Sequence, residues 1–219
     1  MGVNSVQEAA HFLREGIREG KFAPGQRLMA REVADLAGGG VGSFREALVR
    51  LAGEGLVTLH PNRGAAVRKL DRSEVREIYL MLEAIDPLAA RLCAQRAGGF
   101  EIDADALQSA AAALGHACRQ GRVSVYHAAR HSLIELLRSE SGVARICELV
   151  NAPSLQISKR ENESQLTKDA ISESNDEMQI IVSHVLAGEG SKAERTMRAH
   201  IKRIGKLVLE SMPIDARMR

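Results

Sequence analysis

The sequence predicts a mainly α protein, in which an N-terminal winged helix-turn-helix with a small β-hairpin wing precedes a C-terminal antiparallel all-α helical bundle. Three observations support this fold class. Apolar residues recur at helical spacing along most of the chain. Two adjacent segments, residues 56–60 and 65–69, have strand character, and no further convincing strand follows residue 70. We therefore expect two domains, residues 1–70 and 71–219.

Within residues 1–70, the pattern predicts three helices. The first spans Val6 to Gly20, and Pro24-Gly25 lies beyond its end. A short extended piece at residues 26–28 precedes a second helix over residues 31–37, which the glycines at 38–40 end. Ser43 and Glu46 have the spacing of a capping box, so a third helix is expected to begin near Phe44.

A hairpin is expected directly after the third helix. Its two strands flank Pro61-Asn62-Arg63-Gly64, which has the composition of a turn. The order helix, helix, turn, helix, hairpin is that of a winged helix-turn-helix.

Residues 71–219 are expected to form helices only. Their lengths, and the Gly or Ser residues between them, are typical of an antiparallel bundle. The predicted helices cover residues 73–98 with a possible kink at Pro87, 104–120, 123–139, 143–160, 169–187 and 191–212.

Composition excludes several classes of protein. The 45% hydrophobic content suffices for a packed core. The 3% aromatic content and the absence of Trp argue against a surface on which aromatic rings stack with the bases of single-stranded nucleic acid. Three dispersed cysteines fit neither a disulfide framework nor a zinc finger. No apolar run is long enough for a signal peptide or membrane span, so we expect a cytoplasmic protein without a membrane partner.

The third helix and the hairpin predict contact with double-stranded DNA. A helix of this size fits the major groove, and a wing can lie along the backbone. Arg45, in the first turn, is placed to bond guanine O6 and N7, and Arg63 and Gly64 form the wing tip. The alternative is that these arginines are solvated charges. Residues 1–70 carry only a small positive excess, 10 Lys and Arg against 7 Asp and Glu.

Four blocks in order, LREGIREGKFAPGQRL, REVADLAG, FREALVRLAGEGLV and PNRGAAV, resemble the N-terminal domain of GntR-family transcription regulators. The helical remainder resembles the FCD (FadR C-terminal) ligand-binding domain. The resemblance implies a DNA-binding regulator, expected to be a repressor, that binds a two-fold symmetric operator as a homodimer. A small-molecule effector in the bundle, with a carboxylate as one candidate, would modulate it.

The resemblance also implies residues for DNA contact. The family's arginines in the second helix and the recognition segment match Arg31, Val41 and Arg45, so the middle arginine is replaced by valine. The predicted DNA-contacting residues come from the second helix, the recognition segment with its helix, and the wing. They are Arg31, Ser43, Arg45, Arg50, Asn62, Arg63 and Gly64.

The family's bundle often holds a metal through one Asp and three His. His127 and His131 match the first pair, with His in place of Asp, and His200 matches the closing ligand. Met178 occupies the remaining position, and a thioether is a poor ligand for hard ions. A divalent metal (Zn, Ni or Mn) bound by His127, His131 and His200 is one expectation, and hydrogen-bonded core histidines are the alternative.

The expected effector pocket contains Met178, Leu82 and Arg130. Relatives often carry an arginine at the position of Leu82; Arg130, Arg138 and Lys159 could replace it, or could be solvated surface charges. Two other functions remain open. One is a metal-dependent enzyme using His127, His131 and His200 with Glu177 or Glu135 as base, which lacks any accompanying catalytic motif. The other is a DNA-binding dimer whose bundle has lost effector binding.

Overall fold

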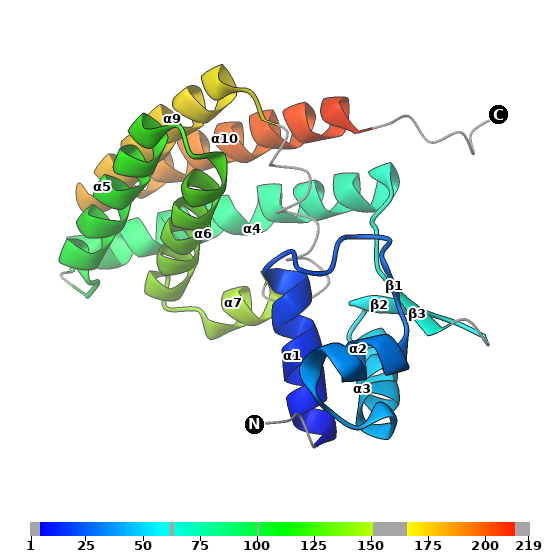
Figure 1. Cartoon of the computed structure of the whole chain (residues 1–219). Coiled ribbons are helices and arrows are strands. Elements are labelled where there is room, and N and C mark those ends of the chain that lie inside the picture. The colour runs from blue at the N-terminus through cyan, green and yellow to red at the C-terminus, as the bar shows by residue number, and fades with distance from the viewer. Residues whose placement is uncertain (1–4, 62–63, 100, 151–165, 213–219) are drawn as a thin grey trace. The chain divides into compact units, whose positions relative to one another are not determined.

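The structure is a computed structural model that describes residues 5–61, 64–99, 101–150 and 166–212. The chain divides into two compact units between Leu70 and Asp71, and each is described by itself (Figure 1). The described residues form helices and one small antiparallel sheet in the first unit and helices in the second, so the mainly α fold class is confirmed.

The first unit contains three helices, α1 (Val6–Arg18), α2 (Ala30–Ala37) and α3 (Val41–Gly53) (Figure 1). A capping box begins α1, where Ser5 Oγ accepts a hydrogen bond from the Glu8 amide and the Glu8 carboxylate accepts one from the Ser5 amide. Gly38 ends α2 in the left-handed conformation, with φ at 67°. The chain then turns directly into α3.

The prediction that the third helix begins near Phe44 is wrong. Helix α3 begins at Val41, and Gly40 is its N-cap with φ −80° and ψ 131°. Ser43 therefore lies inside the first turn and is not the cap. The glycine run can enter a helix without a side-chain cap, so the spacing of Ser43 and Glu46 did not locate the helix start.

A three-stranded antiparallel sheet completes the unit, with the order β1-β3-β2. Its strands are β1 (Arg27–Leu28), β2 (Val57–His60) and β3 (Gly64–Val67). Thr58 pairs with Ala66 across the hairpin, and Arg27 pairs with the same residue from the other side. Asn62 and Arg63, at the predicted wing tip, lie outside the described residues.

An apolar core holds the three helices against the sheet. The ring of Phe12 from α1 makes edge-to-face contacts with Phe22 and with Phe44 of α3, at centroid distances of 6.1 and 6.0 Å. Leu13, Leu28 and Leu51 are almost fully buried around them. This packing leaves the opposite side of α3 exposed.

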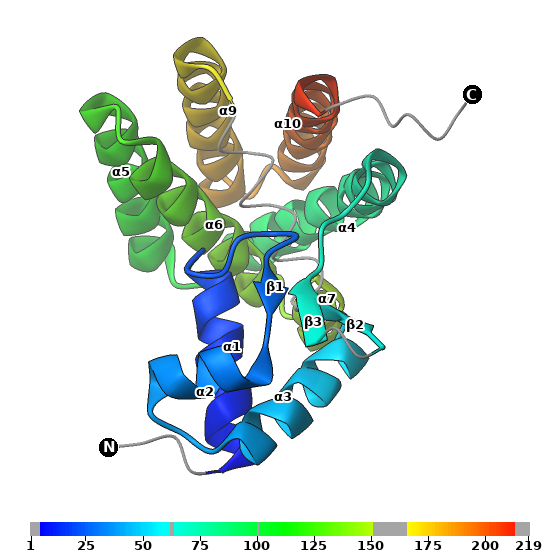
Figure 2. The same cartoon turned by 45° about the vertical axis from the view of Figure 1, so that its right-hand side comes forward.

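The second unit contains helices only, among the residues that are described. These are α4 (Arg72–Gly98), α5 (Ala104–Gln120), α6 (Val123–Glu140), α7 (Ala144–Val150), α9 (Lys168–Leu186) and α10 (Gly190–Ser211). Helix α10 packs along α4 and beside α9, while α5 packs against α6 and α9 (Figures 1 and 2). Helix α4 continues through Pro87. The prediction for residues 143–160 is met over Ala144–Val150, and the rest of that segment falls outside the described ranges.

In the described part of the chain, no helix is both long and apolar enough to cross a membrane.

Candidate nucleic-acid interface and bundle core

Helix α3 has one buried and one exposed face. Phe44, Ala47, Leu48 and Leu51 are buried in the core. The other face exposes the residues at the complementary helical positions, namely Val41, Gly42, Arg45, Glu46, Val49, Arg50 and Gly53. Helix α3 follows α2 after a short turn (Figure 2). This helix-turn-helix therefore presents a free surface of a width that a major groove accepts.

Two arginines of the predicted DNA-contacting set are exposed on this motif. Arg45 lies on the exposed face of α3, and Arg31 is exposed in the first turn of α2. Ser43, in the first turn of α3, is half-buried. These three residues lie on the two helices of one motif, and their contact with DNA stays a prediction.

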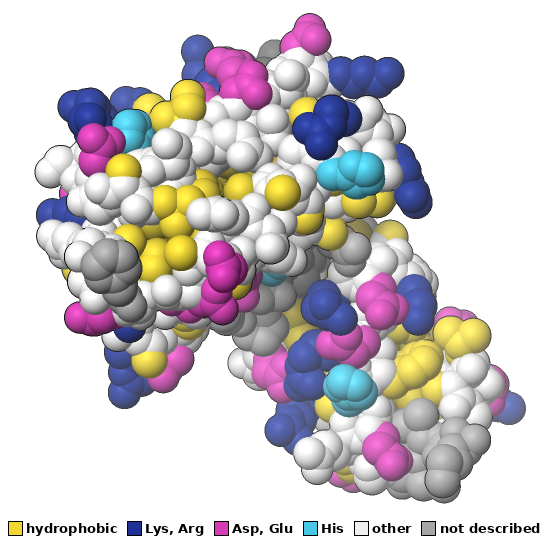
Figure 3. All heavy atoms as spheres, turned by 90° about the vertical axis from the view of Figure 1, so that its left-hand side faces the viewer, with side chains coloured by type: hydrophobic (Ala, Val, Ile, Leu, Met, Phe, Trp, Pro, Cys, Tyr) yellow, Lys and Arg dark blue, Asp and Glu magenta, His cyan; other side chains and the backbone are white. Residues whose placement is uncertain are grey.

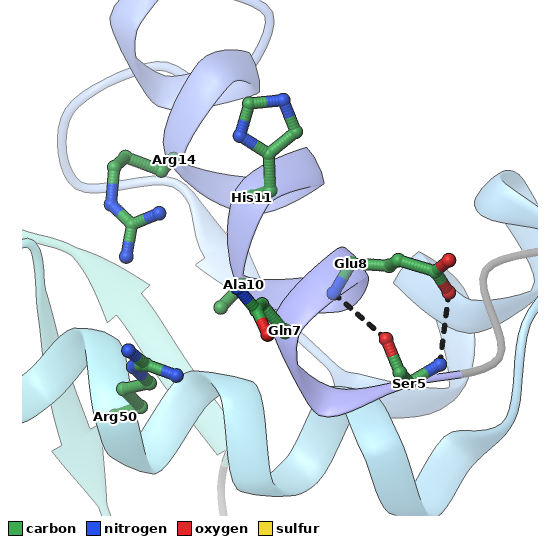
Figure 4. Close-up of a pocket in the computed structure, with 7 residues that line it drawn as sticks. All are labelled: Ser5, Gln7, Glu8, Ala10, His11, Arg14 and Arg50. Atoms are coloured by element: carbon green, nitrogen blue, oxygen red, sulfur yellow. Dashed lines mark hydrogen bonds between the residues drawn. The ribbon is translucent and has the colours of Figure 1, made fainter.

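Arg50 lies at the edge of that face, beside α1. It lines a pocket of about 470 Å³ together with residues of α1 and its cap, Ser5, Gln7, Glu8, Ala10, His11 and Arg14 (Figure 4). Its Nε is 3.6 Å from Glu54 Oε1, and the same carboxylate accepts three hydrogen bonds from Arg14, the shortest at 2.7 Å. Arg50 therefore belongs to an ion-pair cluster with Glu54 and Arg14.

Gly64 has a structural reason to be glycine. Its φ of +79° lies in the left-handed region, and a Cβ there would be 2.8 Å from the carbonyl oxygen of Leu28 in β1. The close approach of β3 to β1 therefore requires glycine. Its predicted role in approaching DNA stays a prediction.

In the bundle, His200 of α10 is fully buried at the centre of a chain of polar contacts. Its Nδ1 is 2.6 Å from Glu177 Oε2 of α9, and the same carboxylate accepts hydrogen bonds from Arg203 at 2.7 and 2.8 Å. On the other side, Arg130 Nη1 of α6 is 3.3 Å from His200 Nε2. The contacts thus connect α6, α10 and α9.

The electrostatics fix the protonation state and the tautomer of His200. Burial lowers the pKa of His200, and the hydrogen bond to Glu177 only partly offsets this. Burial raises the pKa of Glu177, but hydrogen bonds from His200 and Arg203 outweigh it and bring the pKa to about 2. A neutral His200 therefore donates its Nδ1 proton to the Glu177 carboxylate, and its Nε2 lone pair accepts a hydrogen bond from Arg130.

The predicted metal ligands do not fit a divalent metal. His127 is buried, but the side chain of His131 is 42% exposed and its Nε2 is 3.9 Å from Glu135. Arg130 occupies the Nε2 side of His200, and Met178 offers only a thioether. Within the described ranges, no three His, Cys, Asp or Glu residues are grouped to hold an ion. The prediction that His127, His131 and His200 form one Zn, Ni or Mn site is not supported. Residues four apart on α6 differ by about 40° in direction, which places His131 towards the bundle surface.

The three residues of the predicted effector pocket are all buried. Leu82 of α4 is 2% exposed, Met178 of α9 is fully buried, and Arg130 is 4% exposed. That these residues bind an effector stays a prediction.

The alternative that Arg130 and Arg138 are solvated surface charges is wrong. Arg138 is 1% exposed and forms two hydrogen bonds of 2.8 Å with the carboxylate of Asp86, which is 2% exposed. Its third nitrogen is 3.3 Å from Glu135. Asp86 was missed by sequence reasoning, although it lies in the apolar row of its helix, where a carboxylate needs a buried partner. Lys159 lies outside the described residues.

A winged helix-turn-helix with an exposed arginine on α3, followed by an all-α bundle, defines a class of regulators of transcription. Residues 5–67 match the model of the bacterial regulatory proteins of the gntR family, and residues 77–203 match the FCD domain. The chain belongs to the GntR family and carries an FCD domain. The matched family is one of bacterial regulatory proteins, which favours a regulator over the metal-dependent enzyme considered above.

Curated relatives are similar over their matched segments. The HTH-type transcriptional repressor RspR of Escherichia coli is 33% identical over 88 residues, which cover 40% of this chain and 39% of RspR. The repressor GlaR of the same organism is 31% identical over 99 residues, covering 45% of this chain and 44% of GlaR. An uncharacterised HTH-type regulator of Agrobacterium vitis is 33% identical over 85 residues, 39% of this chain and 50% of that protein. The matches therefore span half or less of each relative.

Solved structures show the same fold over nearly the whole chain. A GntR regulator from Rhodococcus sp. RHA1 has a TM-score of 0.77 at 18% identity, and the match covers 95% of this chain and 99% of that one. McbR/YncC of E. coli has a TM-score of 0.76 at 15% identity, with coverage of 94% and 97%. At these identities the likeness establishes the fold alone.

Proposed function

We propose that this regulator binds a double-stranded DNA operator by inserting the first turns of α3 into the major groove. Arg45 then donates two hydrogen bonds to O6 and N7 of a guanine, while Arg31 of α2 binds the backbone nearby. The single observation that carries this proposal is the exposure of Arg45 on the free face of α3, opposite a core that fixes the helix. Gly64 and the wing lie along the backbone or in the minor groove.

The proposal includes a homodimer that represses transcription in the cytoplasm. Two copies are needed because one α3 can contact only one half-site, and two-fold symmetry of the protein requires a two-fold symmetric operator. Repression is inferred from the relatives, since RspR and GlaR are described as repressors.

The proposal also assigns a small-molecule effector to the bundle, with a carboxylate as the preferred class. Arg130 is a guanidinium inside the bundle, and its position is fixed by His200, which Glu177 holds in turn. A fixed guanidinium can bind a carboxylate without a metal ion. An effector alters the affinity for DNA only if it binds the conformation that is competent for DNA binding with a different affinity from the conformation that is not.

In vitro selection with the full-length chain tests the DNA part of the proposal. A pool of random duplexes should yield an enriched sequence with two inverted half-sites whose centres lie about one helical turn, roughly 34 Å, apart. Each half-site should contain a guanine whose contribution disappears in Arg45→Ala. A pool that shows no enrichment after repeated rounds would refute operator recognition.

Thermal unfolding with a panel of short-chain carboxylates tests the effector part. We expect at least one of them to raise the Tm of the wild type and not that of Arg130→Gln, and to change the affinity for the selected duplex. If none changes either quantity, the effector part fails, and the chain is a DNA-binding dimer whose bundle does not bind such ligands.

A further inference from the structure

The tip of α3, residues 38–42, consists of glycine at every position except one. Residues 38–42 read Gly-Gly-Gly-Val-Gly, so Val41 carries the only side chain in the turn and the first helical positions. Val41 is the first residue of α3, and its side chain is exposed, with 40% of the residue surface accessible. Among residues 38–42, Val41 is therefore the residue whose side chain can contact a partner.

The glycines around Val41 are not explained by packing. A Cβ built on Gly42 would meet no atom within 4 Å, and one on Gly40 would meet only the Ser43 hydroxyl at 3.7 Å. Their φ angles lie outside the left-handed region, since neither is among the positive-φ glycines. Larger residues would therefore fit in the free protein. The missing side chains narrow the helix tip and allow its backbone to approach a partner closely.

Val41 lies directly beside Arg45. The two residues are four apart on one helix, which places their Cβ atoms about 5–6 Å from each other on the same exposed face. Stacked bases are about 3.4 Å apart along a strand. A base contacted by Val41 therefore lies within about two base pairs of the guanine contacted by Arg45.

The chemistry of an isopropyl group limits what it can contact in the major groove. Guanine, cytosine and adenine present hydrogen-bonding groups there, and pressing valine against them removes water without replacing the lost bonds. Thymine also presents the O4 acceptor, but beside it stands the C5 methyl group, which offers an apolar contact surface in the major groove. Valine thus favours thymine both by contact and by penalising the other bases.

We propose that Val41 is a specificity-determining residue that contacts the C5 methyl of a thymine, one or two base pairs from the guanine bonded by Arg45. This inference rests on the proposed function, because it requires α3 in the major groove. It assigns direct base recognition to the position where the family's arginine is missing.

The test uses the full-length chain and a duplex selected by it from a random pool. Each thymine of a half-site is replaced in turn by deoxyuridine, which removes only the C5 methyl, and Kd is measured at one salt concentration. We expect one thymine within two base pairs of the Arg45-dependent guanine at which deoxyuridine weakens wild-type binding about three- to tenfold. Val41→Ala should bind the thymine and deoxyuridine duplexes equally.

Val49→Ala is the matched control. Val49 is also exposed, at 55%, but it lies eight residues further along α3, about 12 Å from the tip. This variant should retain the dependence on the methyl at the same thymine. A gain of function completes the design, since Val41→Arg should shift selection at that position from thymine to guanine.

The outcomes separate this inference from the proposed function. If the wild type selects no sequence, the proposed function fails and this inference fails with it. If it selects a sequence that Arg45 recognises but no deoxyuridine replacement matters, or if Val41→Ala keeps the discrimination, only the role of Val41 is refuted.

Discussion

Arg130 Nη1 lies 3.3 Å from His200 Nε2, so a guanidinium faces the imidazole nitrogen that a metal ion would need. The other ring nitrogen donates to Glu177, which fixes the tautomer that leaves the Nε2 lone pair facing Arg130. The guanidinium of Arg130 therefore occupies the position beside His200 Nε2 that a metal ion would take. Both ring nitrogens of His200 thus have partners within the protein.

The first prediction is that the stability of the protein does not depend on metal. The Tm of the wild type should be the same with a chelator as with Zn²⁺, Ni²⁺ or Mn²⁺ at concentrations that saturate typical sites, because no binding energy is available to shift unfolding. Differential scanning fluorimetry combined with elemental analysis of purified protein measures this. One equivalent of tightly held metal, or a Tm that falls with chelator, would contradict the assignment of Arg130.

The second prediction concerns acid stability. The pKa of Glu177 is about 2 in the folded protein and 4.5 as an ordinary carboxyl. The stabilisation is therefore complete above pH 4.5 and is lost as the pH falls from 4.5 towards 2, amounting to at most about 3 kcal/mol. His200 also reduces the stability as the pH falls below 6.5, before Glu177 does. Because its pKa is lowered in the folded protein, the unfolded chain takes up a proton there that the folded chain does not.

Chemical denaturation of wild type and Glu177→Gln between pH 7 and pH 2.5 checks this prediction. The two proteins should differ most near neutral pH, and their free energies of unfolding should converge below pH 4.5. A constant difference over the whole range would mean that Glu177 contributes through packing and not through its charge.

The third prediction concerns the buried pair of Asp86 and Arg138, which joins α4 to α6. Asp86→Asn leaves the buried Arg138 guanidinium without its buried carboxylate, with only Glu135 remaining at 3.3 Å, and should cost about 3–5 kcal/mol, whereas replacing both Asp86 and Arg138 by Leu and Met should cost far less. Urea denaturation at a fixed protein concentration measures both. The exposed pair Arg145 and Glu148 is the control, and Arg145→Ala should cost less than about 1 kcal/mol. A double variant as unstable as Asp86→Asn would refute this account.

The fourth prediction concerns Gly64 in the wing. Gly64→Ala must hold a Cβ in the left-handed region, 2.8 Å from the Leu28 carbonyl, and should lower stability by more than about 1 kcal/mol. Gly53, exposed in the last turn of α3, has open space around it, so Gly53→Ala should be neutral or stabilising by up to about 1 kcal/mol. Thermal unfolding of the two variants compares them directly, and equal Tm values would show that the β1–β3 approach does not require glycine.

Sequence reasoning located most helices of the bundle well, where glycine or serine separates them. The predicted helix at residues 104–120 has the bounds that the structure gives, and Arg45, expected in the first turn of the third helix, lies on its exposed face. The start of α3 was misplaced because glycine can serve as N-cap without a side-chain signal. The periodicity alone could not decide which of His127, Arg130 and His131 faces the interior, because i, i+3 and i+4 positions share one broad face.

The pairings across helices were beyond the reach of a single sequence. Glu177 with His200, and Asp86 with Arg138, are contacts between residues 23 and 52 positions apart. These contacts depend on how the helices pack against one another. Local sequence patterns carry no information on the relative position of two packed helices. The burial of Arg138 became evident only with the partner on α4 in place.

The central claim is that Arg45 on the exposed face of α3 gives this regulator its specific contact with DNA. Fluorescence anisotropy with DNA from upstream of its own gene, against a scrambled duplex, tests it most directly at low and moderate salt. We predict that Arg45→Ala loses discrimination by about 5- to 150-fold, as expected for a bidentate contact with guanine, while Lys21→Ala, which removes an exposed charge outside α2, α3 and the wing, keeps it. Equal, salt-sensitive binding of both duplexes that Arg45→Ala leaves unchanged would contradict the claim and reduce binding to non-specific electrostatics.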